Sequence, residues 1–464
     1  MSNYPIVNIN GLGIIKKASI VLKPLLLLVG PNNSGKTYLM TLLYGLTKIR
    51  FDYATSRFFY INPRKECNEY EILKNTINKA LNQIDSQAEN ATVELGAKEI
   101  VIIESLINTL IKDNKEEFVQ YAFNSDSIKI SSLSILFPKR EKIRIEIGVF
   151  PPTEKGIISS TSYDNDSVLF SFQAEAIRSK KQDVEVSIIG GLLQYVFSCF
   201  SIGGRTMLLG GNALFFPASR TGLLLSYQAI LNDGIEASIS QDKDHTLQYT
   251  RPVLDFIKFL NRKPPLKSES ESNIQVLSLL NDGIIKGRIQ KRSENYFFIP
   301  SNKKSKKITM HLSSGVVTET TPLITALSGQ GYESSYYIEE PEAGLHPKLQ
   351  HVISRCIIRI VNSNRNVVVS THSDIIVNHI NNMIKLAQSD KEGIHAFMEK
   401  YGYDEDDLLL LDNISVYQFV VLPEINQTVA EPIIADDFGF GIPAFNDEFK
   451  KLLKESEEIL EIVE

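Results

Sequence analysis

Apolar and polar residues near the N-terminus follow the pattern of a β-sheet edge leading into a buried strand. Residues 6–9 and 18–22 alternate like half-buried strands on either side of a glycine-containing turn. The run Leu25–Val29 is apolar at every position, which is typical of a central strand covered on both faces. A glycine-bounded loop follows, and then residues 39–46 show helical spacing. The pattern predicts a strand, loop and helix unit at this end of the chain.

The rest of the pattern is helical in the middle of the chain and alternates between strands and helices in the last third. Residues 68–123 show apolar positions three to four apart, residues 128–174 alternate like strands, and residues 350–360 are again helical. Further short strands are predicted at 213–216, 284–289, 296–299, 336–338 and 367–370. Strands and helices that alternate at both ends predict an α/β fold with a mixed sheet flanked by helices.

The length of 464 residues exceeds what one compact core usually holds, so we expect more than one lobe. The predicted sections are 1–60 and 286–385 as two parts of one head, 61–285 as a helical and β insertion, and 386–464 as a C-terminal extension. A net charge of −6 gives no global footprint for nucleic acid, although a local basic patch remains compatible with it.

Targeting and redox signals point to the cytoplasm. The N-terminus lacks the basic and apolar regions of a signal peptide. The most apolar stretch, 188–202, contains Gln194 and is short for a membrane span, so it is predicted to be a buried helix. Three widely spaced cysteines without a CxxC pair indicate free thiols in a reducing compartment. We therefore expect a cytoplasmic protein with no membrane contact.

A phosphate-binding motif follows the first buried strand directly. The segment GPNNSGKT at 30–37 matches GxxxxGK[ST] and stands between a strand and a helix. In this motif, backbone N–H groups surround the phosphates, Lys36 reaches the β- and γ-oxygens, and Thr37 can ligate Mg²⁺. The predicted nucleotide-binding residues are Gly30, Pro31, Asn32, Asn33, Ser34, Gly35, Lys36 and Thr37.

Two adjacent acids end the buried strand at 336–338. Parallel strands present their ligands at the carboxyl end, so Glu339 and Glu340 are expected at the same crevice as the phosphate loop. Glu339 suits the metal, because Mg²⁺ prefers oxygen ligands, and Glu340 suits a water that must be oriented or deprotonated. The alternative is that two exposed acids simply end a strand. His372, at the end of the next strand, is a candidate contact of the γ-phosphate.

The string EEPEAGLHP at 339–347, followed by STHS at 370–373, resembles the ABC-type AAA ATPases related to SMC, RecF and OLD proteins. The resemblance implies that Glu339 is the Walker B acid, Glu340 the catalytic base and His372 the switch histidine. It also implies an ABC-type ATPase head that binds ATP and Mg²⁺ in a head-to-tail pair. The resemblance covers motifs at both ends of the chain and is weaker in the middle.

Members of this family carry a signature loop that contacts the γ-phosphate held by the partner head. Two candidates exist, LSSG at 312–315 and LSGQG at 327–331. The loop opens a helix that precedes the Walker B strand. Ser313 lies 26 residues before Glu339, which leaves room for that helix, whereas Ser328 lies only 11 residues before it. The predicted signature is therefore Ser313, Ser314 and Gly315, and its action in trans implies a homodimer or higher homo-oligomer.

Two features between the motifs have open interpretations. Arg220, in the segment FFPASRTG, resembles an arginine of OLD-like ATPases and is a candidate nucleotide sensor or bridge between heads. The alternative is an arginine that caps a strand end. The basic stretch 286–307, interleaved with aromatic residues, would suit nucleic acid or an acidic partner, or it forms a solvated hairpin.

The expected function is that of an ATP-hydrolysing sensor or scaffold subunit. The resemblance extends to the ATPase components of the anti-phage systems PARIS and Septu, which implies a separate effector protein such as a nuclease. One alternative is a RecF-like DNA-binding ATPase in repair. Another is an ATP-dependent clamp with little turnover.

Overall fold

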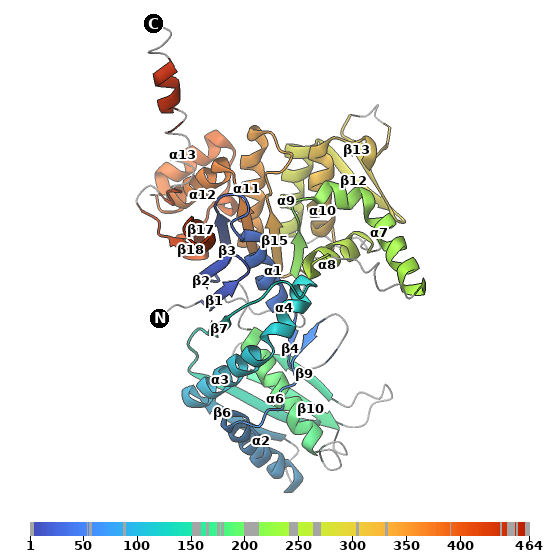
Figure 1. Cartoon of the computed structure of the whole chain (residues 1–464), viewed down its shortest axis with the longest axis vertical. Helices are drawn as coiled ribbons and strands as arrows, with labels where there is room; N and C mark the ends of the chain where they lie inside the picture. The colour runs from blue at the N-terminus through green and yellow to red at the C-terminus, as the bar shows by residue number, and fades with distance from the viewer. Residues whose placement is uncertain are drawn as a thin grey trace.

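The fold is given by a computed structural model, in which a head built on a large sheet joins a smaller second lobe (Figure 1). The structure describes residues 4–52, 54, 58–86, 90–150, 159–163, 167–173, 177, 181–198, 213–240, 249–262, 271–302, 306–329, 333–389, 391–436, 439–442, 451 and 453–459.

A mixed sheet of nine strands forms the head. In spatial order its strands are β11 (Ala213–Phe216), β15 (Ser335–Glu339), β16 (Asn366–Thr371), β3 (Leu25–Val29), β17 (Ile414–Leu422), β18 (Gln427–Ile433), β2 (Ile15–Val21), β1 (Ile6–Leu12) and β7 (Ser132–Leu136). The first five are parallel to one another, and antiparallel pairs join β17 to β18, β2 to β1 and β1 to β7. The carboxyl ends of the first five strands therefore lie along one edge.

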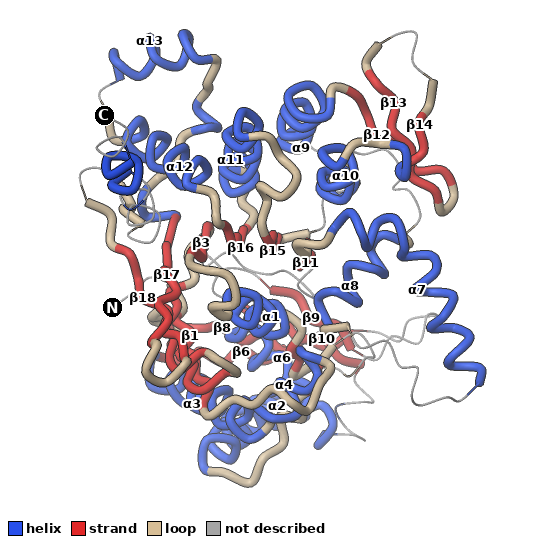
Figure 2. The backbone as a smooth tube through the Cα atoms, turned by 45° about the horizontal axis from the view of Figure 1, so that its top comes forward, coloured by secondary structure: helices blue, strands red, loops and turns tan. Residues whose placement is uncertain are grey.

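Helices cover both faces of this sheet, which explains why β3 is apolar throughout. Leu26 and Leu28 face one hydrophobic core, whereas Leu25, Leu27 and Val29 face the other. Helix α1 (Lys36–Leu46) packs on the first side. The second side carries α10 (Gly315–Leu327), α11 (Pro347–Asn362) and α12 (Asp374–Ala387) (Figure 2). The predicted α/β class, with a mixed sheet flanked by helices, is confirmed.

The second lobe combines a four-stranded sheet with helices. Its elements are α2 (Asn68–Ser86), β6 (Asn90–Gly96), α3 (Ala97–Asp113), α4 (Lys115–Phe123), β8 (Lys142–Phe150), β9 (Ser159–Tyr163), β10 (Ser167–Gln173) and α6 (Lys181–Ser198), and the short strands β4 (Ile49–Arg50) and β5 (Phe59–Tyr60) pair nearby. The prediction of a purely helical segment at 68–123 is wrong at β6. There Ala91 and Leu95 are buried against the sheet in strand alternation, a signal too short to stand out between two helices.

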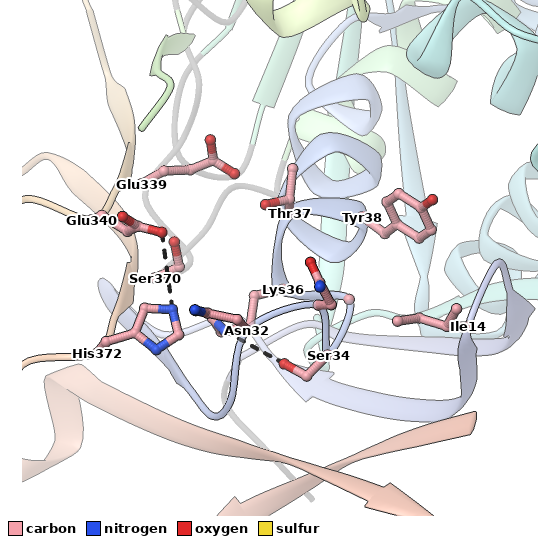
Figure 3. Close-up of a pocket in the computed structure, with 12 residues that line it drawn as sticks. Ile14, Asn32, Ser34, Lys36, Thr37, Tyr38, Glu339, Glu340, Ser370 and His372 are labelled. Atoms are coloured by element: carbon pink, nitrogen blue, oxygen red, sulfur yellow. Dashed lines mark hydrogen bonds and ion pairs between the residues drawn. The ribbon is translucent and has the colours of Figure 1, made fainter. Parts of the chain in front are cut away.

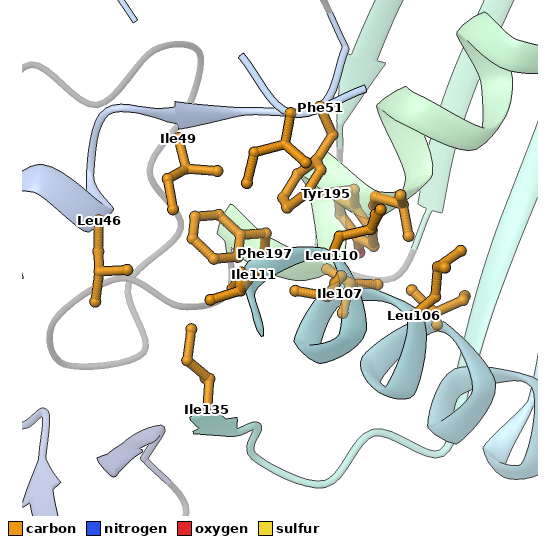
Figure 4. Close-up of a cluster of buried hydrophobic side chains, with 14 of the residues drawn as sticks. Leu46, Ile49, Phe51, Leu106, Ile107, Leu110, Ile111, Ile135, Tyr195 and Phe197 are labelled. Atoms are coloured by element: carbon orange, nitrogen blue, oxygen red, sulfur yellow. The ribbon is translucent and has the colours of Figure 1, made fainter. Parts of the chain in front are cut away.

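A continuous apolar core joins the two lobes. Leu46 at the end of the phosphate-loop helix, and Ile49 and Phe51 after it, lie in one cluster with Leu106 and Ile107 of α3 (Figure 4). The predicted insertion 61–285 also contributes β7 and β11 to the main sheet. The lobe is thus packed directly against the base of α1.

The described residues between β11 and the predicted signature form three α-helices, one π-helix, one 3₁₀ turn and a small antiparallel sheet. Its elements are α7 (Arg220–Ser240), α8 (Arg251–Leu260), α9 (Glu271–Ser278), a π-helix η3 (Leu279–Ile285), β12 (Gly287–Arg292), β13 (Asn295–Pro300), β14 (Ile308–Thr309) and the 3₁₀ turn η4 (Met310–Leu312). The strand predicted at 284–289 begins only at Gly287. Ile284 and Ile285 are buried in the last turn of the π-helix, because helix packing, not sheet pairing, covers them.

The C-terminal section returns to the main sheet after helix α13 (Lys391–Tyr401). Before β17 come two 3₁₀ turns, η5 (Glu405–Asp407) and η6 (Leu411–Asn413). Asp407 is fully buried and pairs with Arg355 and Arg359 of α11 at 2.7 and 2.8 Å. These contacts anchor the section on α11. Among the described residues, no helix has the length and apolarity needed to cross a bilayer.

Candidate functional site

Most of the predicted site residues, with the exception of the signature, lie where four neighbouring parallel strands end. The phosphate loop follows β3, the two acids end β15, His372 follows β16, and Arg220 follows β11. A pocket of about 610 Å³ opens at this edge (Figure 3). It is lined by Ile14, Asn32, Asn33, Ser34, Gly35, Lys36, Thr37, Tyr38, Glu339, Glu340, Ser370 and His372. Its volume suits a small organic ligand such as a nucleotide.

Glycine is required at both ends of the phosphate loop. Gly30 has φ 144°, and a Cβ atom there would lie 2.9 Å from Phe419 of β17. Gly35 has φ 95°, and a Cβ atom there would lie 2.8 Å from Ile15. L-residues rarely adopt this backbone conformation. The turn therefore brings backbone N–H groups round to the start of α1, the geometry on which a phosphate can bind.

Lys36 is held inside its own loop. Its ammonium group donates to the carbonyl oxygens of Gly30 and Pro31 at 3.0 and 2.7 Å, and it lies 3.4 Å from Ser34 Oγ. Burial lowers the pKa of Lys36 to about 8, although the nearby acids, Glu340 foremost, act in the opposite direction. The group is therefore largely protonated at neutral pH, positioned for anionic oxygens at the loop.

Glu339 presents a free carboxylate oxygen beside Thr37. Its Oε2 accepts from the backbone N–H of Ala218 at 3.2 Å, and its side chain bonds that of Thr37. Oε1 is buried with no hydrogen-bond partner among the described residues. Burial raises the pKa of Glu339. The Thr37 hydroxyl faces a carboxylate that keeps one oxygen without a partner (Figure 3), which fits Mg²⁺, an ion that commonly uses one or two protein ligands together with phosphate and water.

Glu340 has an unusual backbone and an accessible side chain. Its φ of 42° lies in the left-handed region, which costs a non-glycine residue on the order of 1 kcal/mol. The backbone N–H donates to Ser370 O at 2.8 Å, and the carbonyl accepts from Ala343 N–H at 2.9 Å. The carboxylate is 43% exposed toward the pocket, 3.9 Å from His372 Nε2. This conformation turns the carboxylate away from the sheet and toward the phosphate loop (Figure 3).

His372 is supported by a residue whose role the sequence did not indicate. Burial, with help from Lys36, lowers the pKa of His372, so the imidazole is neutral near pH 7. Glu342 Oε1 accepts from the backbone N–H of His372 at 2.7 Å and bonds the side chain of Thr371. Glu342 lies inside the quoted acidic string, and its position three residues after Glu339 was the available signal.

The predicted signature residues lie on the surface and outside this pocket. Ser314 is the N-cap of α10, and Ser314 and Gly315 are exposed. No described atom lies within 4 Å of where a Cβ atom of Gly315 would stand. The competing candidate, at 327–331, begins where α10 ends, since Ser328 is the C-cap; residues 330 and 331 lie outside the described residues. Only the earlier loop opens a helix.

Arg220 and the basic stretch are less directly placed at the site. Arg220 is buried and does not line the described pocket; it binds backbone carbonyls at the end of β15, which favours the strand-capping alternative. In the basic stretch, Lys291 donates to Leu260 O and Arg262 O, so it is structural. Burial lowers its pKa to about 8. Lys303 and Lys304 lie outside the described residues.

Comparisons with known proteins agree with the motifs over one segment. No curated protein matches the sequence. The SMC head domain from Thermotoga maritima is 13% identical with a TM-score of 0.32, over 93% of this chain and 100% of that one. An SmcHead bound to the C-winged helix domain of ScpA is 11% identical with a TM-score of 0.33, over 92% and 98%. Residues 328–377, which carry Glu339, Glu340 and His372, match the family described as AAA ATPase domain, so the chain is similar to AAA ATPases where its acids and histidine lie.

Proposed function

We propose that the chain binds ATP with Mg²⁺ and hydrolyses it between two copies of the head. The observation that carries the proposal is the pocket at the ends of β3, β15 and β16. It gathers a phosphate loop, two acids and a histidine from segments about 300 residues apart in sequence. This set of groups supplies anion binding, metal ligation and water orientation at one place.

The chain's own groups divide the work of phosphoryl transfer. The loop N–H groups and Lys36 bind the phosphates, and the N-terminus of α1 adds a favourable dipole. Thr37 and Glu339 are the residues that would hold Mg²⁺, which neutralises charge on the phosphate oxygens. Glu340 orients or deprotonates the attacking water, and neutral His372 hydrogen-bonds the γ-phosphate.

The location of the predicted signature supports a pair of heads. None of the residues 313–315 lines the described pocket of its own chain, and Ser314 and Gly315 face solvent at the start of a helix. A helix N-terminus at which a glycine is exposed to solvent allows close approach of a phosphate that is bound to another head. If residues 313–315 of a second copy complete the site, the chain acts as a homodimer or higher homo-oligomer whose closure depends on ATP.

The test of this function is phosphate release from ATP by the purified chain. We expect turnover with Mg²⁺ and its loss when the metal is removed by EDTA. ATP binding without turnover in Mg²⁺ would contradict the proposal and would favour an ATP-dependent clamp. Stimulation of turnover by DNA would favour the repair alternative.

We further propose that the ATPase acts as a sensor or scaffold in anti-phage defence, with destruction carried out by a separate effector protein. The support is the resemblance of the strings at 339–347 and 370–373 to ABC-type AAA ATPases related to OLD proteins, and of the segment 215–222 to OLD-like and related defence ATPases. The measurement is phage plating on bacteria that carry the gene with its neighbours. Protection that is lost with Lys36→Ala is expected. Equal plating on cells with and without the genes contradicts the role.

A further inference from the structure

Arg220 is buried at the point where the acids of the site leave the sheet. It is the first residue of α7 and its side chain is 4% exposed. One guanidinium nitrogen donates to Glu339 O at 2.5 Å, and the other donates to Glu340 O at 2.9 Å. Its contacts are thus to the backbone that carries both acids.

These contacts act on a strained piece of backbone. Glu340 is held in the left-handed conformation from both sides, by Ser370 O at its N–H and by Arg220 at its carbonyl. A residue in such a conformation keeps it only when the surroundings enforce it. The direction of the Glu340 carboxylate depends on this φ. Loss of the hydrogen bond to the Glu340 carbonyl is therefore expected to misalign the carboxylate that orients water.

The remaining guanidinium nitrogen, Nε, faces the signature helix α10. Arg220 Nε lies 3.0 Å from Glu319 Oε2, and Glu319 is on α10, one turn after Gly315. The other oxygen of Glu319 accepts from Thr221 N–H at 3.2 Å. The hydroxyls of Thr221 and Thr318 bond at 2.8 Å. Hydrogen bonds and an ion pair therefore join the first turn of α7 to the first turn of α10.

A second contact joins the same helix to the segment after the acids. Gly344 has φ 70°, and a Cβ atom there would lie 3.2 Å from Glu319 Cγ and 3.8 Å from the backbone of Gly315. The turn that follows Glu340 thus packs against the opening of α10. The signature end of α10 is therefore linked to the Glu340 backbone by two routes, through Arg220 and through this turn.

We propose that Arg220 is a positioning residue that couples the signature helix to Glu340 through Glu319. This inference rests on the proposed ATPase function. When a partner head's nucleotide engages Ser313–Gly315, the position of α10 sets that of Glu319 and Arg220, and hence the backbone of the water-orienting acid. Arg220 does not touch the nucleotide. Through Arg220, hydrolysis in one head depends on contact between the signature of that head and the nucleotide bound to the partner head.

The experiment separates nucleotide affinity from turnover in Arg220→Lys, Glu319→Gln and the double variant. Lysine keeps the charge but cannot hold two carbonyls and a carboxylate at once, and glutamine keeps the acceptor for Thr221 N–H. We expect Arg220→Lys to lower kcat about 10- to 100-fold, because a small misplacement of a catalytic group has effects of that size. The dissociation constant of a fluorescent ATP analogue stays within about twofold of wild type. The double variant is no slower than Arg220→Lys, because both act through one link.

Arg359→Lys is the matched control. Arg359 is also a buried arginine that binds carboxylates, here Asp407 and Asp404, but at the far end of α11. It is expected to lower the thermal midpoint and leave kcat unchanged. If Arg220→Lys does not fold, Glu319→Gln carries the same comparison.

The outcomes distinguish the inference from the function beneath it. A kcat within twofold of wild type in Arg220→Lys and Glu319→Gln overturns the coupling while the ATPase stands. A loss of ATP affinity matching the loss of turnover also overturns it, because Arg220 is then a nucleotide contact. A wild-type protein without turnover overturns the proposed function and this inference together.

Discussion

Glu340→Gln is expected to lower the kcat of ATP hydrolysis about 10²- to 10³-fold and to trap the ATP-bound pair of heads. General-base catalysis contributes about 10²- to 10⁴-fold, and glutamine retains the shape of the side chain without its basicity. Binding is expected to be preserved because Lys36 and Glu339, not Glu340, are the residues proposed to hold the phosphates and the metal. ATP is therefore expected to bind and to close the heads without being cleaved.

The measurement combines phosphate release with size-exclusion chromatography in ATP and Mg²⁺. Glu405→Gln, the same change at an exposed position in η5, is the control and should behave as wild type. Turnover of Glu340→Gln close to the wild-type rate would remove this residue from the chemistry. If a larger assembly of Glu340→Gln forms to the same extent without ATP, oligomerisation does not depend on nucleotide binding.

Ser313→Arg is expected to abolish both ATP-dependent pairing and turnover while each head still binds ATP. Ser313 precedes the N-cap of α10, and Leu312 beside it is 72% exposed, so a bulky cation there obstructs the face offered to a partner. Loss of one transition-state donor costs about 10²- to 10³-fold, and the steric block adds to it.

Turnover measured against protein concentration checks this variant. Wild type should rise more steeply than in proportion to concentration, and Ser313→Arg should remain near background at all concentrations. Ser301→Arg places the same side chain on an exposed position after β13 and serves as control. Normal hydrolysis by Ser313→Arg would mean that the signature lies elsewhere.

The sequence predicted the parts of the site that depend on local pattern. Leu25–Val29 is apolar throughout because both faces of β3 are covered, and the motif GPNNSGKT directly after it identified the phosphate loop. Glu339 and His372 end strands that are neighbours in the sheet, so the rule for parallel strands brought them to the pocket. Spacing likewise placed Ser314 at the start of a helix.

Contacts between segments that are distant in the sequence could not be predicted from it. Glu319 looks like one exposed acid on a helix, and only the packing of α10 against α7 reveals that it faces Arg220. The positive φ of Glu340 has no sequence signature, because most non-glycine residues avoid that region. The strand at 90–96 was hidden between two helices, where tertiary packing decided a weak local preference.

The most direct test of the head-to-tail account mixes Glu340→Gln with Ser313→Arg before ATP is added. Each variant alone lacks one half of every composite site. A mixed pair contains one site with the intact acids of the Ser313→Arg head and the intact signature of the Glu340→Gln head. The account predicts that the mixture hydrolyses ATP well above the sum of the two variants measured separately. Hydrolysis equal to that sum, in a mixture that size-exclusion chromatography shows to contain mixed pairs, contradicts a site shared between two heads.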